Sequence, residues 1–166
     1  MERVCVIGCP GSGKSTFSRR LRDGTGLPLV YLDMLYHRPD RTTVSREEFD
    51  RALDEILQRD RFILDGNYAR TLERRLMRSD TVFFLDYPVE VCLEGIEARF
   101  GKPREDMPWV ETERDGEFME FIRTFGENVR PEILRMLSKY PQIETIVFHS
   151  RDEAEDYLRR SDNGQH

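Results

Sequence analysis

The residues with the clearest chemistry come near the start of the chain. A short apolar run at residues 4–7 is followed by Gly8 and, after four more residues, by Gly13-Lys14-Ser15. This is the pattern of a loop that binds phosphate groups, in the strand–loop–helix context that such a loop requires. The glycines let the backbone approach a polyphosphate, while the loop N–H groups and the following helix N-terminus face the anion. We therefore expect a bound nucleoside triphosphate.

Two side chains of this loop have expected roles of their own. Lys14 supplies a mobile positive charge for the β- and γ-phosphates, and the Ser15 hydroxyl is the expected ligand of Mg²⁺, which prefers oxygen atoms. The plain alternative is a glycine-rich turn that binds nothing, but every required residue type falls on the pattern. The residues predicted to bind ATP in this loop are Gly8, Pro10, Gly11, Ser12, Gly13, Lys14, Ser15 and Thr16.

Length and composition limit the class of protein. The 166 residues predict one domain, which we place at residues 1–160, followed by a disordered tail at 161–166. The net charge of −6 argues against a nucleic-acid partner, because general duplex binders are usually basic. No apolar run approaches the roughly 20 residues of a membrane span. The three cysteines lack metal-ligand spacing, which predicts free thiols in a cytoplasmic protein. The sequence leaves open whether the protein is a monomer or a homodimer.

The rest of the chain alternates apolar runs with amphipathic stretches. Runs at residues 29–32, 61–64, 81–85 and 143–148 predict four more strands, and a capping box at 45–48 opens one of the helices between them. Residues 34–44 have no regular pattern. Five strands alternating with helices predict a parallel three-layer α/β fold, whose ligands bind at the carboxyl ends of the strands.

Three carboxylates stand at predicted strand ends. Phosphoryl transfer needs a group that holds the waters of the metal and, for an alcohol acceptor, a group that takes the leaving proton. We assign Asp65 to the metal together with Ser15, and Asp33 to acceptor binding or to the role of general base. Asp86 also follows an apolar run and stays an alternative to Asp65, although Pro88 favours a structural turn there.

A polar stretch at about residues 101–116 is a candidate lid, because it contains proline and glycine and shows little periodicity. Arginines delivered by a lid stabilise the charge on a transferred phosphoryl group. Arg99 and Arg104 flank or occupy this stretch, and we assign both to catalysis. Arg130, in the helical region that follows, is assigned to ATP binding. Further candidates for ligand contact are Arg70, Arg75 and Arg123.

Several segments taken together resemble a known group of proteins. They are residues 8–16, 31–33, 65–68 and 82–86, with weaker similarity at 102–107 and 130–131. In these segments the chain resembles the topology-modulation (FlaR-type) proteins, a branch of the adenylate-kinase-like P-loop kinases. The resemblance covers nearly the whole chain. It implies a five-stranded parallel sheet in the order 2-3-1-4-5, ATP with Mg²⁺ as the phosphate donor, and a mobile lid.

The segment that carries most of this resemblance also departs from a related group. Asp65-Gly66 is similar to the Asp-Gly at the end of the third strand in nucleoside monophosphate kinases, where the aspartate serves the metal site. Those kinases continue with Phe-Pro-Arg, whereas residues 67–70 read Asn-Tyr-Ala-Arg. The lid stretch is short and has no zinc cysteines. The resemblance therefore leaves the acceptor unidentified.

These features predict an ATP-dependent kinase that transfers the γ-phosphoryl group, with Mg²⁺, to a small acceptor such as a nucleotide or a nucleoside. The alternative is a nucleotide-sensing regulator of DNA topology with vestigial catalysis, in which the arginine-rich residues 70–78 would contact DNA. A GTPase is less favoured, because the sequence has no Asn-Lys-x-Asp guanine motif.

Overall fold

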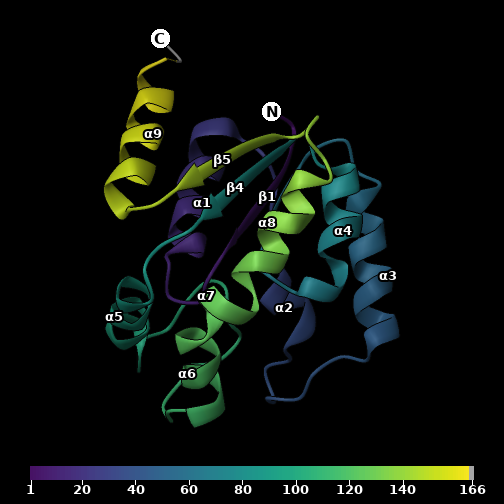
Figure 1. Ribbon diagram of the computed structural model, residues 1–166. Coiled ribbons are helices and arrows are strands. Elements are labelled where there is room, and N and C mark those ends of the chain that lie inside the picture. The colour runs from purple at the N-terminus through teal and green to yellow at the C-terminus, as the bar shows by residue number, and fades with distance from the viewer. Residues whose placement is uncertain (165–166) are drawn as a thin grey trace.

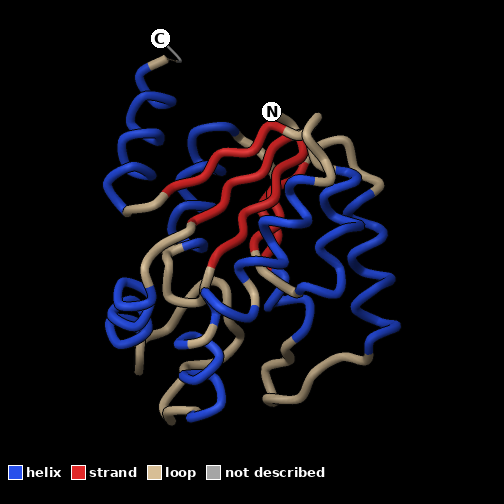
Figure 2. Tube along the Cα trace, in the orientation of Figure 1, coloured by secondary structure: helices blue, strands red, loops and turns tan. Residues whose placement is uncertain are grey.

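The computed structural model describes residues 1–164, which form a parallel β-sheet with helices on both faces (Figures 1 and 2). The strands are β1 (Arg3–Gly8), β2 (Leu29–Tyr31), β3 (Phe62–Asp65), β4 (Thr81–Leu85) and β5 (Glu144–Phe148). Their order is β2-β3-β1-β4-β5, and every neighbouring pair is parallel. The predicted three-layer α/β fold and its strand order are confirmed.

The central strands carry the core. All residues of β3 and β4 are buried, as are all of β1 except Arg3. Strands covered on both faces have near-continuous apolar sequences, which is why these runs could be recognised. Over β4, the rings of Phe17, Phe83 and Phe148 pack against one another, with centroids 4.9 to 6.1 Å apart. This packing fixes α1 (Lys14–Thr25), and therefore the phosphate loop, on the sheet.

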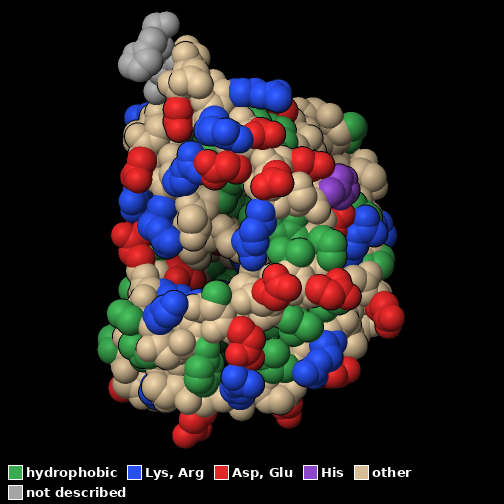
Figure 3. Space-filling model, turned by 90° about the vertical axis from the view of Figure 1, so that its left-hand side faces the viewer, with side chains coloured by type: hydrophobic (Ala, Val, Ile, Leu, Met, Phe, Trp, Pro, Cys, Tyr) green, Lys and Arg blue, Asp and Glu red, His purple; other side chains and the backbone are tan. Residues whose placement is uncertain are grey.

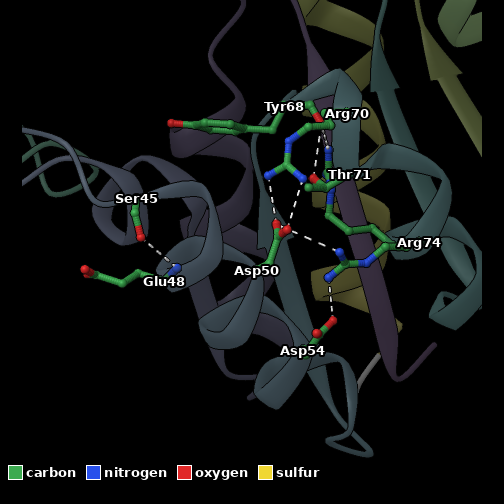
Figure 4. Close-up of polar contacts among 9 residues, drawn as sticks. Ser45, Glu48, Asp50, Asp54, Tyr68, Arg70, Thr71 and Arg74 are labelled. Atoms are coloured by element: carbon green, nitrogen blue, oxygen red, sulfur yellow. Dashed lines mark hydrogen bonds and ion pairs between the residues drawn. The ribbon is translucent and has the colours of Figure 1, made fainter.

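The helices divide between the two faces (Figure 1). Helix α1 lies with α9 on one face, and α3, α4 and α8 cover the other. The Ser45 hydroxyl accepts the N–H of Glu48 at the start of α3, as the capping box predicts (Figure 4). The helices after α1 are α2 (Leu32–Tyr36), α3 (Arg46–Leu57), α4 (Ala69–Arg78), α5 (Val89–Arg99), α6 (Gly116–Arg123), α7 (Phe125–Asn128), α8 (Arg130–Ser138) and α9 (Arg151–Asn163).

Two segments differ from the sequence expectation. Residues 34–44 were expected to be irregular, but α2 continues from β2 to Tyr36 because Leu32 packs into the core. Asp33 therefore lies in the first turn of a helix, where a carboxylate is stabilised by the helix dipole. Helix α9 continues through Ser161 to Asn163, so this part of the expected tail is helical. Residues 165 and 166 of that tail lie outside the described residues.

The arginine-rich helix α4 is packed against α3 rather than left as a free basic surface. Arg70 donates to both carboxylate oxygens of Asp50, at 2.8 and 3.1 Å, and Arg74 pairs with Asp54 (Figure 4). On the face shown in Figure 3, over α5 and α9, positive and negative side chains are interspersed. The DNA-binding alternative is therefore not favoured.

Within residues 1–164, no helix has both the length and the apolar character that a membrane span needs.

Arg75 is fully buried and holds the turn after β3. Its guanidinium donates to the carbonyls of Gly66 (3.0 Å), Asn67 and Tyr68 (3.3 Å). Tyr68 adopts a left-handed backbone conformation (φ 37°), which is unfavourable for a residue other than glycine. Burial lowers the pKa of Arg75, while nearby groups that include Asp65 raise it. Arg75 thus stabilises a strained turn and is not placed to contact a ligand.

Replacing Arg75 by methionine is expected to destabilise the protein by about 3 kcal/mol or more, because the three carbonyls lose their buried donor. Arg70→Met is the matched control. It removes an exposed ion pair and should cost no more than about 1 kcal/mol. Urea unfolding of the two variants measures the difference, and equal losses of stability would contradict the role assigned to Arg75.

Candidate active site

The phosphate loop joins β1 to α1 and requires glycine for two reasons. Gly11 and Gly13 have left-handed backbone angles, with φ of 85° and 96°. A Cβ atom on Gly11 would also lie only 2.0 Å from the carbonyl oxygen of Cys92 in α5. Helix α1 begins at Lys14, so its N-terminus adjoins the loop, as an anion site requires.

Asn67 ties the loop to the end of β3. Its side-chain amide donates to the carbonyl of Gly8 at 2.6 Å and accepts the Gly8 N–H at 3.0 Å. Asn67 belongs to the segment at residues 65–68 that carries the family resemblance, but the sequence predicted no role for its side chain. An amide side chain can satisfy a backbone donor and acceptor together, which an aspartate at this position would not do.

Two further contacts fix the other side of the loop. Arg151, at the start of α9, donates to the carbonyls of Ser12 (2.8 Å) and Gly11 (3.1 Å). In α5, a Cβ atom on Gly95 would lie 1.9 Å from the Gly11 oxygen, so the helix backbone packs directly on the loop. The sequence analysis missed both residues. A glycine inside a helical stretch was the available signal for Gly95.

Asp65 is the last residue of β3 and is only 5% exposed. Burial raises its pKa to about 6; Asp106 and Asp33 add to this rise, whereas Lys14 and a hydrogen bond with Ser15 oppose it. Its Oδ2 atom has no hydrogen-bond partner among residues 1–164. An unpartnered buried carboxylate oxygen beside a serine hydroxyl fits the oxygen ligands that Mg²⁺ prefers.

No cluster of three or more His, Cys, Asp or Glu residues that could hold a metal ion occurs in the described part of the chain. Mg²⁺ at a phosphate loop takes one or two protein ligands and completes its shell with phosphates and waters. Asp65 and Ser15 are therefore the residues that would hold it.

One cavity of about 1080 Å³ brings most of the predicted site residues together. Gly8 and Ser12 belong to the loop but do not line it. Loop residues, strand-end carboxylates and lid arginines therefore share one continuous space. The predicted residues that line the cavity are Pro10, Gly11, Gly13, Lys14, Ser15, Thr16, Asp33, Asp65, Arg99 and Arg104.

Arg130 lies outside the cavity that contains the phosphate loop. Its Nε donates to both carboxylate oxygens of Asp86, at 2.9 and 3.0 Å, next to a smaller cavity of about 480 Å³. Arg130 is the first residue of α8, whose first turn contains Pro131, and its partner Asp86 directly follows β4. The structure therefore does not bring Arg130 to the predicted ATP site, and it gives Asp86 an ion-pair partner.

The candidate lid joins α5 to α6 and contains no helix or strand from residue 100 to 115. Glu105 accepts a hydrogen bond from the Tyr31 hydroxyl and lies 3.4 Å from Arg22 of α1, while Asp106 is only 6% exposed. The segment is thus held against the body of the protein. Arg99, at its start, has a buried Nε with no partner in the described residues, and burial lowers its pKa.

A carboxylate and several aromatic rings line another part of the same cavity. The Tyr68 hydroxyl donates to Asp33 Oδ1 at 2.6 Å, which orients that carboxylate. The rings of His37 and Trp109 meet edge to face, with centroids 4.9 Å apart. All four residues line the cavity. The sequence analysis singled out only Asp33 as a site residue here, because these aromatic groups meet through the tertiary fold.

Comparison with known proteins identifies related kinases. No protein-family model matches the chain. A putative adenylate kinase from Methanocaldococcus jannaschii is 27% identical over 122 residues, which cover 67% of this chain and 66% of that protein, just under two thirds of its length.

Solved structures show the same fold at low sequence identity. A shikimate kinase from Acinetobacter baumannii, in complex with shikimate, has a TM-score of 0.63 and 17% identity, over 99% of this chain and 95% of that one. A gluconokinase from Sinorhizobium meliloti 1021 has a TM-score of 0.60 and 15% identity, over 98% of this chain and 90% of the gluconokinase chain. The chain has the fold of a P-loop kinase. The similarities support the P-loop kinase superfamily, whereas the topology-modulation branch stays a prediction.

The contact between α5 and the phosphate loop can be tested at Gly95. Gly95→Ala is expected to displace the loop and weaken ATP binding by about ten- to a hundredfold, because small misplacements of a binding loop are costly. Gly126→Ala is the matched control, since a Cβ there meets nothing within 4 Å. Calorimetric titration with ATP and Mg²⁺ measures the affinity of both variants for ATP. Unchanged ATP binding by the Gly95 variant would contradict the assigned contact.

The burial of Asp65 predicts that its carboxylate destabilises the ligand-free fold. Its pKa of about 6 in the folded protein is above the value of 3.8 for a free side chain. Between these two pH values the folded state therefore holds a proton on Asp65 that the unfolded state has released. Stability therefore falls as the pH rises through this window. Asp65→Asn should raise the free energy of unfolding by up to about 3 kcal/mol above pH 6, and the gain should disappear towards pH 4.

Unfolding curves of the ligand-free protein at pH 4.5 and pH 8 measure this effect. Asp86→Asn is the control, because it breaks the ion pair with Arg130 and should lower stability at pH 8. A loss of stability at pH 8 in the Asp65 variant would show that the carboxylate is structurally satisfied and not held ready for a ligand.

Proposed function

We propose that the protein is a kinase that transfers the γ-phosphoryl group of ATP, with Mg²⁺, to a small-molecule acceptor of the nucleotide or nucleoside kind. We also propose that it belongs to the topology-modulation branch of the P-loop kinases. The observation that carries the kinase proposal is the single cavity that joins the phosphate loop to Asp33 across the buried Asp65. The similarity to proteins named as kinases supports it.

The loop N–H groups and Lys14 hold the β- and γ-phosphates in this proposal, and Ser15 and Asp65 hold the metal. Bound Mg²⁺ would neutralise charge on the phosphate oxygens. Arg99 and Arg104 stabilise the charge that spreads over the transferred group. The lid segment excludes water, which would otherwise take the phosphoryl group.

Asp33 serves the acceptor. Because its Oδ1 atom accepts from Tyr68, its Oδ2 atom is left for a hydroxyl group of the acceptor. As the acceptor oxygen bonds to the γ-phosphorus, the bond from that phosphorus to the leaving oxygen of ADP breaks. The hydroxyl proton passes to Asp33.

Phosphoryl transfer can be measured with purified protein, ATP and Mg²⁺ against a panel that includes AMP, shikimate, gluconate, nucleosides and simple sugars. Lys14→Met should abolish acceptor-stimulated turnover. Asp33→Asn should lower kcat by about 10²- to 10⁴-fold, the usual contribution of a general base, with ATP binding retained. Asp54→Asn, an exposed carboxylate on α3, should behave as the wild type.

Two results would contradict the proposal. One is the absence of acceptor-stimulated turnover across the whole panel. The other is full activity of the Asp33 variant, which would remove the acceptor role from this end of the cavity.

A further inference from the structure

Carboxylates dominate the end of the cavity that the proposed function assigns to the acceptor. Asp33 enters it from α2, and Asp106 and Glu111 enter it from the lid segment. Asp106 is 6% exposed, and the side chain of Glu111 is 30% exposed. Charges that are this far removed from water interact more strongly than surface charges do. A further negative group placed among these three carboxylates is therefore disfavoured.

The lid arginine nearest to these carboxylates is already paired. Arg104 Nη2 donates to Glu111 Oε1 at 3.3 Å, and Nη1 lies 3.8 Å from Asp106 Oδ2. The Arg104 side chain is only 13% exposed, so the pair is shielded from solvent. A guanidinium group recognises a phosphate or a carboxylate best through two free parallel N–H groups. Glu111 and Asp106 occupy that edge of Arg104, so only its other N–H groups are left for the phosphoryl group of the donor, and none is free for an anionic group on the acceptor.

The remaining wall holds the guanidinium of Arg99, which the proposed function gives to the phosphoryl group of ATP, together with aromatic rings. His37 and Trp109 present ring surfaces, and burial lowers the pKa of His37, against the opposing effect of Asp33 and Glu111. The imidazole is therefore neutral near pH 7. Carboxylate oxygens that accept from hydroxyl groups, beside ring surfaces that cover an apolar face, are suited to a sugar or a nucleoside.

We infer that the acceptor is an electrically neutral compound with several hydroxyl groups, a sugar or a nucleoside, and that Glu111 and Asp106 exclude monophosphates and sugar acids. The inference rests on the proposed kinase function. Transfer to such an acceptor converts a neutral hydroxyl into a phosphate monoester, with the hydroxyl proton left on Asp33. The product is an anion, so the same carboxylates favour its release.

Anion binding at this end can be tested without knowledge of the acceptor. Trp109 is the only tryptophan and lines the cavity, so its fluorescence reports on ligands there. The donor site is filled with Mg²⁺ and a non-hydrolysable ATP analogue, and inorganic phosphate is titrated as the probe. The fluorescence of the wild type should show no saturable response to phosphate up to about 10 mM, which corresponds to negligible affinity. Glu111→Gln, which frees Arg104, should bind phosphate at least about tenfold more tightly.

Glu132→Gln is the matched control, because Glu132 pairs with Arg135 on the exposed face of α8 and does not line the cavity. It should respond as the wild type does. Saturable phosphate binding by the wild type with affinity equal to that of the Glu111 variant would overturn the inference.

Turnover provides a second readout with matched pairs, each a neutral compound and its anionic counterpart: adenosine and AMP, uridine and UMP, glucose and gluconate. The neutral member of the accepted pair should have a kcat/KM at least about tenfold higher. Preferred transfer to the anionic member would also overturn the inference. If no compound accepts phosphate, the proposed kinase function fails its own test, while the phosphate titration still decides the charge preference.

Discussion

The phosphate loop keeps its shape because neighbouring backbone and side chains meet it at short range. Asn67 makes a reciprocal pair of hydrogen bonds with Gly8, and the α5 backbone at Gly95 lies directly against the loop. The first contact also joins the carboxyl ends of β1 and β3. In the parallel register of these strands Val6 is opposite Asp65, so the carboxylate reaches the edge of the sheet beside the loop. The positions of the proposed anion site and the proposed metal site are thus set together.

Two buried charges lie on either side of the turn after β3, and they differ in what satisfies them. Arg75 is satisfied by backbone carbonyls and stabilises the strained conformation at Tyr68. Asp65 is left with a buried oxygen that has no hydrogen-bond partner among the described residues. A buried polar atom without a partner costs stability, and such atoms concentrate at sites where a ligand completes them. This contrast separates the structural charge from the one that we assign to function.

The sequence predicted features that depend on local pattern, and it missed those that depend on packing. The loop motif, the buried strands and the Ser45 cap are each encoded within a few residues, so they were recognised. The burial of Arg75 and the pairing of Arg130 with Asp86 depend on groups distant in the chain. In the same way, Trp109 meets His37 only because the lid segment folds back over α2. No periodicity or spacing records such contacts.

The central claim is that the cavity between the loop and Asp33 is a site of phosphoryl transfer. The most direct measurement follows ATP labelled with heavy oxygen at the γ-phosphate, incubated with the protein, Mg²⁺ and a cellular small-molecule extract, with mass spectrometry of the products. The account predicts label in one phosphorylated small molecule with the wild type, and none with Lys14→Met. Label that appears only in inorganic phosphate would contradict it.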